Sequence, residues 1–247
     1  MAILSEAARA LGSNRAAVAL YAVLSVGAGA AVSLCDTVTA DGLFFAVSPF
    51  VQRASQFVTD VFLAAAVACA SSVAFSRMGA DIDRPFWKMP SDREALRRFF
   101  ALWFVLALSQ LTALRLLSLT TETSPFRTWV KILFLLTVLL STPMGACNVF
   151  PGEFRWERFV QNLAPFLSRF TNALAVLFVN FVLFFAYLAL AGWVAEQPEF
   201  RTAFWPQSVI DAIFCVADCY VFAATWLICM AHRREMEENQ RYSDYDI

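Results

Sequence analysis

The residues best suited to chemistry are two acids inside the last hydrophobic run of the chain, Ser208 to Met230. Asp211 and Asp218 are seven residues apart, which is about two helical turns, so a helix places both on one face. A carboxylate at the centre of a bilayer costs about 2.5–3.5 kcal/mol on insertion scales. We therefore expect this face to point toward protein or a water-filled cavity, with the rest of the chain sheltering it.

Polar residues also interrupt an earlier hydrophobic run, Phe44 to Phe75. Arg53, Gln56 and Asp60 follow one another at i, i+3 and i+7, so they share a helix face. This face is predicted to point inward, toward other helices or a cavity, because lipid does not solvate such groups.

The helical rise of about 1.5 Å per residue predicts the depth of each polar group. Asp218, Asn180 and Gln110 each lie about 15 Å along the helix from its entry into the membrane, so they are predicted to form a buried polar layer. The outer half is predicted to hold two acids and three bases that neutralise one another: Asp60, Asp211, Arg53, Arg115 and Lys131.

Two interpretations of these residues remain open. The structural one is a clamp between helices, in which each hydrogen bond contributes less than about 2 kcal/mol. The functional one is a pathway in which Asp218 is a proton or cation site. A water-filled cavity reaching Asp218 favours the pathway, whereas a dry, ion-paired interior favours the clamp.

The composition places the chain in a membrane. Of its 247 residues, 60% are hydrophobic and 16% are charged, and the mean hydropathy is +0.60. Soluble domains are about 45–50% apolar and about 25% charged. The 25 Phe and seven Trp suit lipid-facing and interfacial surfaces. A net charge of −1 predicts no nucleic-acid partner, and the predicted environment is the lipid bilayer.

Six hydrophobic runs predict an all-α polytopic membrane protein, a bundle of six transmembrane helices with short interfacial helices. Residues 1–231 form its single six-span domain, and residues 232–247 form a charged cytoplasmic tail. An alternative for the first run is a cleaved signal peptide, although its apolar centre is longer than usual. The predicted spans are Ala16–Leu34, Phe44–Phe75, Asp92–Leu119, Val130–Val149, Phe170–Ala195 and Ser208–Met230.

The segments between the spans carry their own local signals. Residues 1–15 have the apolar spacing of a short surface helix. Ser91 and Glu94 form a capping box that starts the third span. The apolar residues from Phe154 to Leu163 predict an interfacial helix. In the tail, Arg234 and Glu238 are four apart and extend the sixth helix into water.

The placement of Lys and Arg predicts the orientation. Fourteen of the 19 lie at the termini and in the two even-numbered connections. The positive-inside rule therefore places both termini in the cytoplasm, with the chain in a bacterial cytoplasmic (inner) membrane. The architecture loosely resembles broad six-span families of bacterial membrane proteins, a resemblance that carries no site residues.

Catalytic and metal-binding signatures are missing from the sequence. It has no Gly-rich phosphate loop, no GxSxG, no CxxC among its six Cys, and one His, His232. We expect no cofactor, no metal and no enzymatic activity. The sequence favours a non-catalytic membrane component that binds other membrane proteins or lipids. The alternative is a small transporter or channel-like protein that uses Asp218 and Asp60 as proton or cation sites.

Overall fold

The protein is all-α in the part of the chain that the structure, a computed structural model, describes: residues 2–41, 49–83, 87–88, 90–121, 124–197 and 205–245. Side chains are described in these ranges except at 32–41, 49–55 and 242–245. The regular elements there are α1 (Ala2–Ser13), α2 (Arg15–Asp41), α3 (Pro49–Ile82), α4 (Asp92–Leu119), α5 (Pro125–Val149), α6 (Ala164–Ser168), α7 (Phe170–Glu196) and α8 (Trp205–Tyr245), with two short 3-10 turns before α6.

The helices are long and apolar enough for a polytopic membrane protein, as predicted. Five of them meet the length and hydropathy of a span: α4, α5, α7, the stretch Gln56–Ile82 of α3 and the stretch Trp205–Arg241 of α8. A sixth span is formed if α1 and the adjoining part of α2, which are bent by 80° relative to each other, count as one. The predicted surface helix at the N-terminus is α1, which packs against α8.

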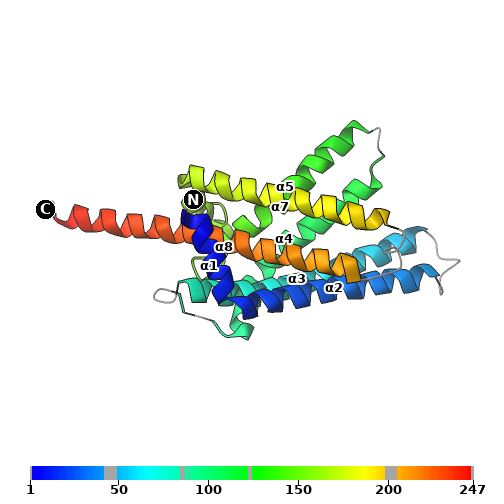
Figure 1. The fold of residues 1–247 in the computed structure, drawn as a ribbon, viewed down its shortest axis with the longest axis horizontal. Coiled ribbons are helices and arrows are strands. Elements are labelled where there is room, and N and C mark those ends of the chain that lie inside the picture. The colour runs from blue at the N-terminus through cyan, green and yellow to red at the C-terminus, as the bar shows by residue number, and fades with distance from the viewer. Residues whose placement is uncertain are drawn as a thin grey trace.

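Helix α8 is the centre of the bundle. It packs against α1, α2, α3, α5, α6 and α7 (Figure 1). All six side chains from Val221 to Trp226 are 0% exposed, so this part of α8 is covered on every side. The helix then continues out of the bundle to Tyr245, which confirms the predicted helical extension of the tail.

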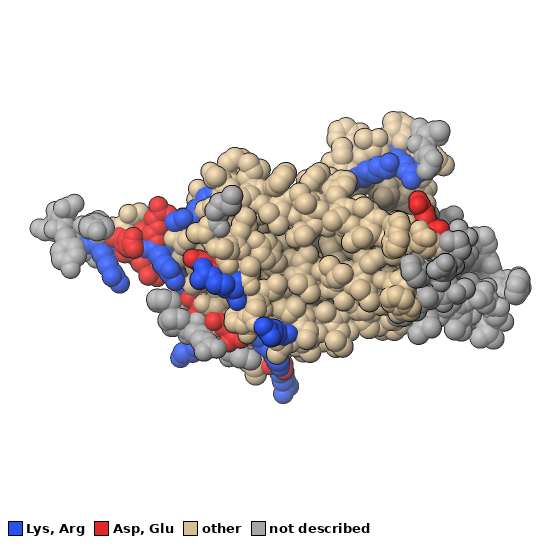
Figure 2. Space-filling view, in the orientation of Figure 1, with Lys and Arg blue, Asp and Glu red and all other residues tan. Residues whose placement is uncertain are grey.

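The bundle has two different ends. Both chain termini lie toward the same end, on the left of Figure 1, which we call the terminal end; the opposite one is the distal end. Charged side chains gather at the terminal end, and a broad uncharged belt follows it (Figure 2). We call the half of the bundle next to the terminal end the terminal half, and the half next to the distal end the distal half.

Aromatic rings fill the terminal half. Phe75 of α3 stacks on Phe222 of α8 with ring centroids 4.5 Å apart. Two glycines allow indole rings to lie against helix backbone: a Cβ at Gly79 would lie 2.6 Å from the Trp226 ring, and a Cβ at Gly145 would lie 2.1 Å from the Trp103 ring. Because neither position has room for a methyl group, this half is closely packed.

The connections confirm one local prediction and correct another. Glu94 donates its backbone N–H to Ser91 Oγ at 3.3 Å, which confirms the N-cap half of the predicted capping box, while the Glu94 carboxylate pairs with Arg98. The predicted interfacial helix from Phe154 to Leu163 is wrong. The chain there forms two 3-10 turns, Trp156–Arg158 and Gln161–Leu163, and then α6. Gly152, with φ +82°, turns the chain just after the end of α5. The segment between this turn and α6 is short.

Candidate functional site

A proline in α5 creates the first polar contact of the interior. Pro143 has no N–H, so the carbonyl of Leu139 lacks its usual helical donor. Asn180 of α7 donates Nδ2 to that oxygen at 3.0 Å. Asn180 is buried, with an exposed fraction of 2%. A buried amide and a carbonyl freed by proline thus satisfy each other, and α7 is fixed to α5.

The other two residues of the predicted polar layer also bind to α5. Gln110 of α4 donates Nε2 to Ser141 Oγ at 2.5 Å and to the Thr137 carbonyl at 3.4 Å. Asp218 of α8 accepts a hydrogen bond from Thr142 Oγ1 at 3.1 Å. Three helices therefore meet one stretch of α5, just before its proline. No hydrogen bond joins Gln110, Asn180 and Asp218 directly among the residues with described side chains.

Asp218 is bonded by hydroxyl groups rather than by a cation. Its second oxygen accepts from the hydroxyl of Tyr21, on α2, at 3.3 Å. Within the described part of the chain no Lys, Arg or His forms an ion pair with this carboxylate. An acid in the apolar part of α8 thus has donors for both oxygens but no neutralising charge among the described residues.

A cavity of about 170 Å³ borders Asp218. Helices α4, α5, α7 and α8 supply its walls, which are mainly aromatic and aliphatic. At the helical rise, the lining residues lie about 8 to 20 Å from the distal ends of their helices, so the cavity occupies the distal half. Those residues are Gln110, Leu111, Leu114, Phe134, Val138, Phe184, Tyr187, Phe214 and Asp218.

Asp211 lies on the same side of α8 and connects to this cavity through a tyrosine. Its Oδ1 accepts from the Tyr187 hydroxyl at 3.1 Å and from Gln207 Nε2 at 2.8 Å. Tyr187 itself lines the cavity. Asp211 and Asp218 therefore lie at successive depths on one side of α8, and each accepts hydrogen bonds from neutral donors.

The predicted charge pairing in the distal half occurs between α3 and α4. Arg115 donates to both oxygens of Asp60, with Nε–Oδ2 of 3.0 Å and Nη2–Oδ1 of 2.8 Å. The Asp60 side chain is 13% exposed, and it does not line the cavity. Lys131 is exposed and makes no ion pair among the described side chains. The side chain of Arg53 lies outside the described residues.

Sequence reasoning missed the partners that complete the site: Tyr21, Ser141, Thr142 and the carbonyl of Leu139. One signal for them was available. Pro143 inside a hydrophobic run implies a carbonyl without a donor four residues earlier, and Asn180 was already expected at membrane depth. No comparable signal marks Tyr21, because its contact with Asp218 depends on how α2 and α8 are rotated.

The described residues contain no group of three His, Cys, Asp or Glu that could hold a metal ion. The thiols of Cys147 and Cys229 lie 3.8 Å apart in the buried core, where they pack between α5 and α8. No known family, curated protein or solved structure matches this chain.

Proposed function

We propose that the protein is a small transporter or channel-like membrane protein that takes a proton or a small cation at Asp218. The observation that supports this is a carboxylate in the wall of a cavity at membrane depth, without an ion-pair partner in the described chain. A charge at this depth costs free energy unless a proton or cation compensates it. A site that only clamps helices would gain more from a paired base, as Asp60 does from Arg115.

The route to Asp218 comes from the distal side in this proposal. The cavity lies in the distal half, and Tyr187, which lines it, donates a hydrogen bond to Asp211, seven residues before Asp218 on α8. Beyond Asp218, the aromatic packing of Phe75, Phe222 and Trp226 fills the terminal half. The proposal requires that the cavity be reached from the distal side in this conformation, and transport requires a second conformation in which the terminal packing opens.

The proposed orientation of the protein in the membrane follows from the placement of Lys and Arg. We propose that the terminal end, which carries most of the Lys and Arg, faces the cytoplasm of a bacterial cell. The cavity then faces the outside. A reporter enzyme that is active only in the cytoplasm, fused after Ile247, is expected to be active; an inactive fusion beside an active external reporter would reverse the orientation.

The function is tested by reconstituting the protein into liposomes that contain a pH-sensitive dye. Wild type is expected to conduct protons or to couple them to a cation gradient, and Asp218→Asn is expected to abolish that flux. The matched control is Asp60→Asn, which changes the same kind of residue outside the cavity and is expected to retain flux per folded molecule. Flux that survives Asp218→Asn would refute the site.

The second candidate is a non-catalytic membrane component that binds other membrane proteins or lipids. The closely packed terminal half, with its ion pairs at the membrane edge, supports it. If wild type shows no flux in any gradient, this candidate replaces the first. We propose no enzymatic activity in either case.

A further inference from the structure

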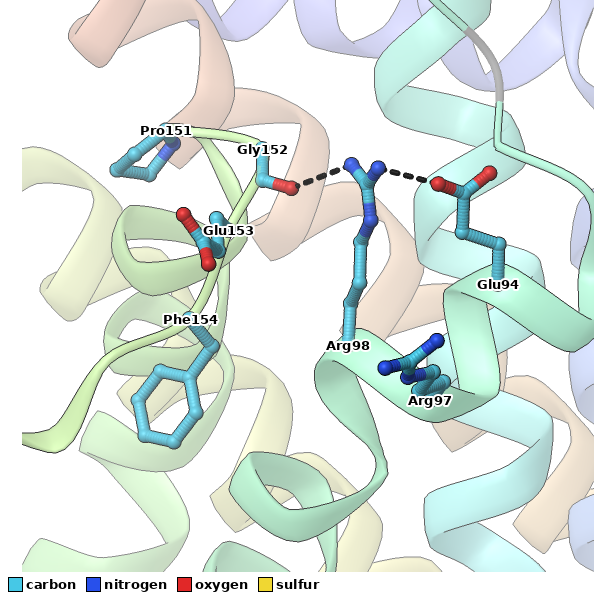
Figure 3. A pocket seen from close by; sticks show the side chains of 7 residues that line it. All are labelled: Glu94, Arg97, Arg98, Pro151, Gly152, Glu153 and Phe154. Atoms are coloured by element: carbon cyan, nitrogen blue, oxygen red, sulfur yellow. Dashed lines mark hydrogen bonds and ion pairs between the residues drawn. The ribbon is translucent and has the colours of Figure 1, made fainter.

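A polar cavity of about 660 Å³ lies at the terminal end, between the first turns of α4 and the loop that leaves α5. Glu94, Arg97 and Arg98 of α4 face Gly152, Glu153 and Phe154 of the loop across it (Figure 3). Arg97 and Arg98 directly precede the apolar stretch of α4, which begins at Phe99. The cavity therefore lies where the bundle passes from the lipid tails to the headgroups.

The two acids in this cavity are already neutralised. Glu94 is paired with Arg98, one helical turn later, and Glu153 is paired with Arg155 at 2.9 Å. Arg97 is exposed and makes no ion pair or hydrogen bond among the described residues (Figure 3). Arg93, one turn earlier on α4, is also exposed. The charge left available at the cavity is therefore positive.

The loop that forms the other wall is held in place. Arg98 donates Nη1 to the carbonyl of Gly152 at 2.9 Å while its other nitrogen binds Glu94 (Figure 3). Gly152 has φ +82°, and a Cβ there would lie 3.5 Å from Nε1 of the buried Trp87. Arg98 therefore positions the wall, and Arg97 remains the guanidinium that can bind a ligand.

An aromatic cluster continues from this wall along the loop. The rings of Phe154 and Trp156 meet edge to face with centroids 4.6 Å apart, and Phe159 packs against both. Trp156 is 52% exposed, and Val160, four residues later in the chain, is 73% exposed. Exposed Trp next to bare apolar side chains is typical of the membrane–water boundary. A ligand with a phosphate at Arg97 would thus have its apolar part beside these residues.

We propose that this cavity binds the phosphate headgroup of an anionic glycerophospholipid, with Arg97 as the phosphate ligand and the Phe154–Trp156 pair beside the glycerol and upper acyl chains. Arginine suits the oxygens of a phosphate ester because its planar guanidinium donates two parallel hydrogen bonds. The inference gives the second candidate function a ligand class and a site, and it is independent of transport at Asp218.

The test uses the full chain in lipid nanodiscs made with phosphatidylcholine and a minor fraction of phosphatidylglycerol. Native mass spectrometry after gentle removal of bulk lipid counts the retained anionic lipid. Wild type is expected to retain phosphatidylglycerol over phosphatidylcholine, and Arg97→Ala is expected to lose about fivefold in that preference. Arg97→Lys, which keeps the charge but not the fork, is expected to recover part of it.

The matched control is Arg234→Ala, which removes an exposed arginine of α8 at the same end of the bundle, away from the cavity. It is expected to change the preference by less than about twofold. Equal losses in the two variants would overturn the site in favour of general surface charge. Displacement of the lipid by millimolar glycerol phosphate or inorganic phosphate would overturn the lipid assignment in favour of a free phosphate ester. Wild type without any anionic preference would refute lipid binding itself.

Discussion

Asp218 divides α8 into two stretches with different surroundings. Toward the terminal end, every side chain from Val221 to Trp226 is fully buried. Toward the distal end, Ile213 is 57% exposed and Val216 is 39% exposed, and the polar face of the helix borders a cavity. Helix α8 is therefore the packed centre of the bundle in the terminal half and one wall of the cavity in the distal half.

The same contrast appears in how each half treats its ionisable residues. In the terminal half, the fully buried Asp83 receives Arg233 Nη2 at 2.6 Å, and that guanidinium also lies over the Phe150 ring. In the distal half, Asp211 and Asp218 receive only neutral donors. Because uncompensated acids are costly in a membrane, Asp211 and Asp218 point to function in the distal half, whereas the paired Asp83 points to stability in the terminal half.

The largest effect is expected from filling the contact between Gly145 and Trp103 in the terminal half. Gly145→Ala would place a Cβ 2.1 Å from the indole ring, which is itself packed in the core. Neither α4 nor α5 can move without disturbing the aromatic rings that fill the terminal half. We therefore expect a loss of about 3 kcal/mol or more in the free energy of unfolding. Denaturation in mixed detergent micelles measures it.

Gly192→Ala on α7 is the control for that substitution, because nothing lies within 4 Å of its added Cβ. It is expected to be neutral or to stabilise by up to about 1 kcal/mol through helix propensity. Equal stabilities for the two variants would show that the terminal half is not the rigid part of the bundle.

The next effect concerns Asp60, an acid of the distal half that is paired with a base. Asp60→Ala removes both acceptors of the Arg115 fork. Because Arg115 is 37% exposed, we expect a loss of about 2 kcal/mol, between the values of exposed and buried pairs. Glu153→Ala, which breaks a pair exposed on both sides, is expected to cost less than about 1 kcal/mol. A smaller loss for Asp60→Ala than for Glu153→Ala would contradict a clamp there.

Much of this division can be predicted from the sequence, for physical reasons. Lipid requires long apolar helices, so the hydrophobic runs predict the spans, and the helical rise predicts that Gln110, Asn180 and Asp218 share a depth. The residue that each of these side chains contacts cannot be predicted in the same way. Whether Asp218 meets Tyr21 or a base depends on the rotation of α2 and α8, which hydropathy does not fix when most of a helix surface is apolar.

Local chemistry between the spans is predicted unevenly. The cap at Ser91 is confirmed because it depends on residues three positions apart. The helix expected from Phe154 to Leu163 is wrong because apolar spacing does not reveal the turn at Gly152 or the cluster formed by Phe154, Trp156 and Phe159. Amphipathic spacing alone cannot tell a helix from short turns whose rings pack on one another.

A smaller effect tests the link between Pro143 and Asn180. Asn180→Ala leaves the Leu139 carbonyl without a donor, and we expect a loss of about 1 kcal/mol in the free energy of unfolding. In a Pro143→Ala background, the new N–H of residue 143 can bond to that carbonyl within α5. The cost of Asn180→Ala should then fall toward its packing contribution. A double-mutant cycle by micellar denaturation measures the difference, and additive costs would show that the amide serves another purpose.

The smallest change in stability is expected at the residue with the largest expected change in function. Asp218→Asn keeps an oxygen that can accept from Thr142 or Tyr21, and it removes a charge that no base neutralises in the described chain. We therefore expect the free energy of unfolding to change by less than about 0.5 kcal/mol or to rise. The same micellar assay, run beside the liposome flux of this variant, measures both properties. A loss above about 1 kcal/mol would place Asp218 with Asp60 and Asp83 as a structural acid, and the distal half would then differ from the terminal half in packing alone.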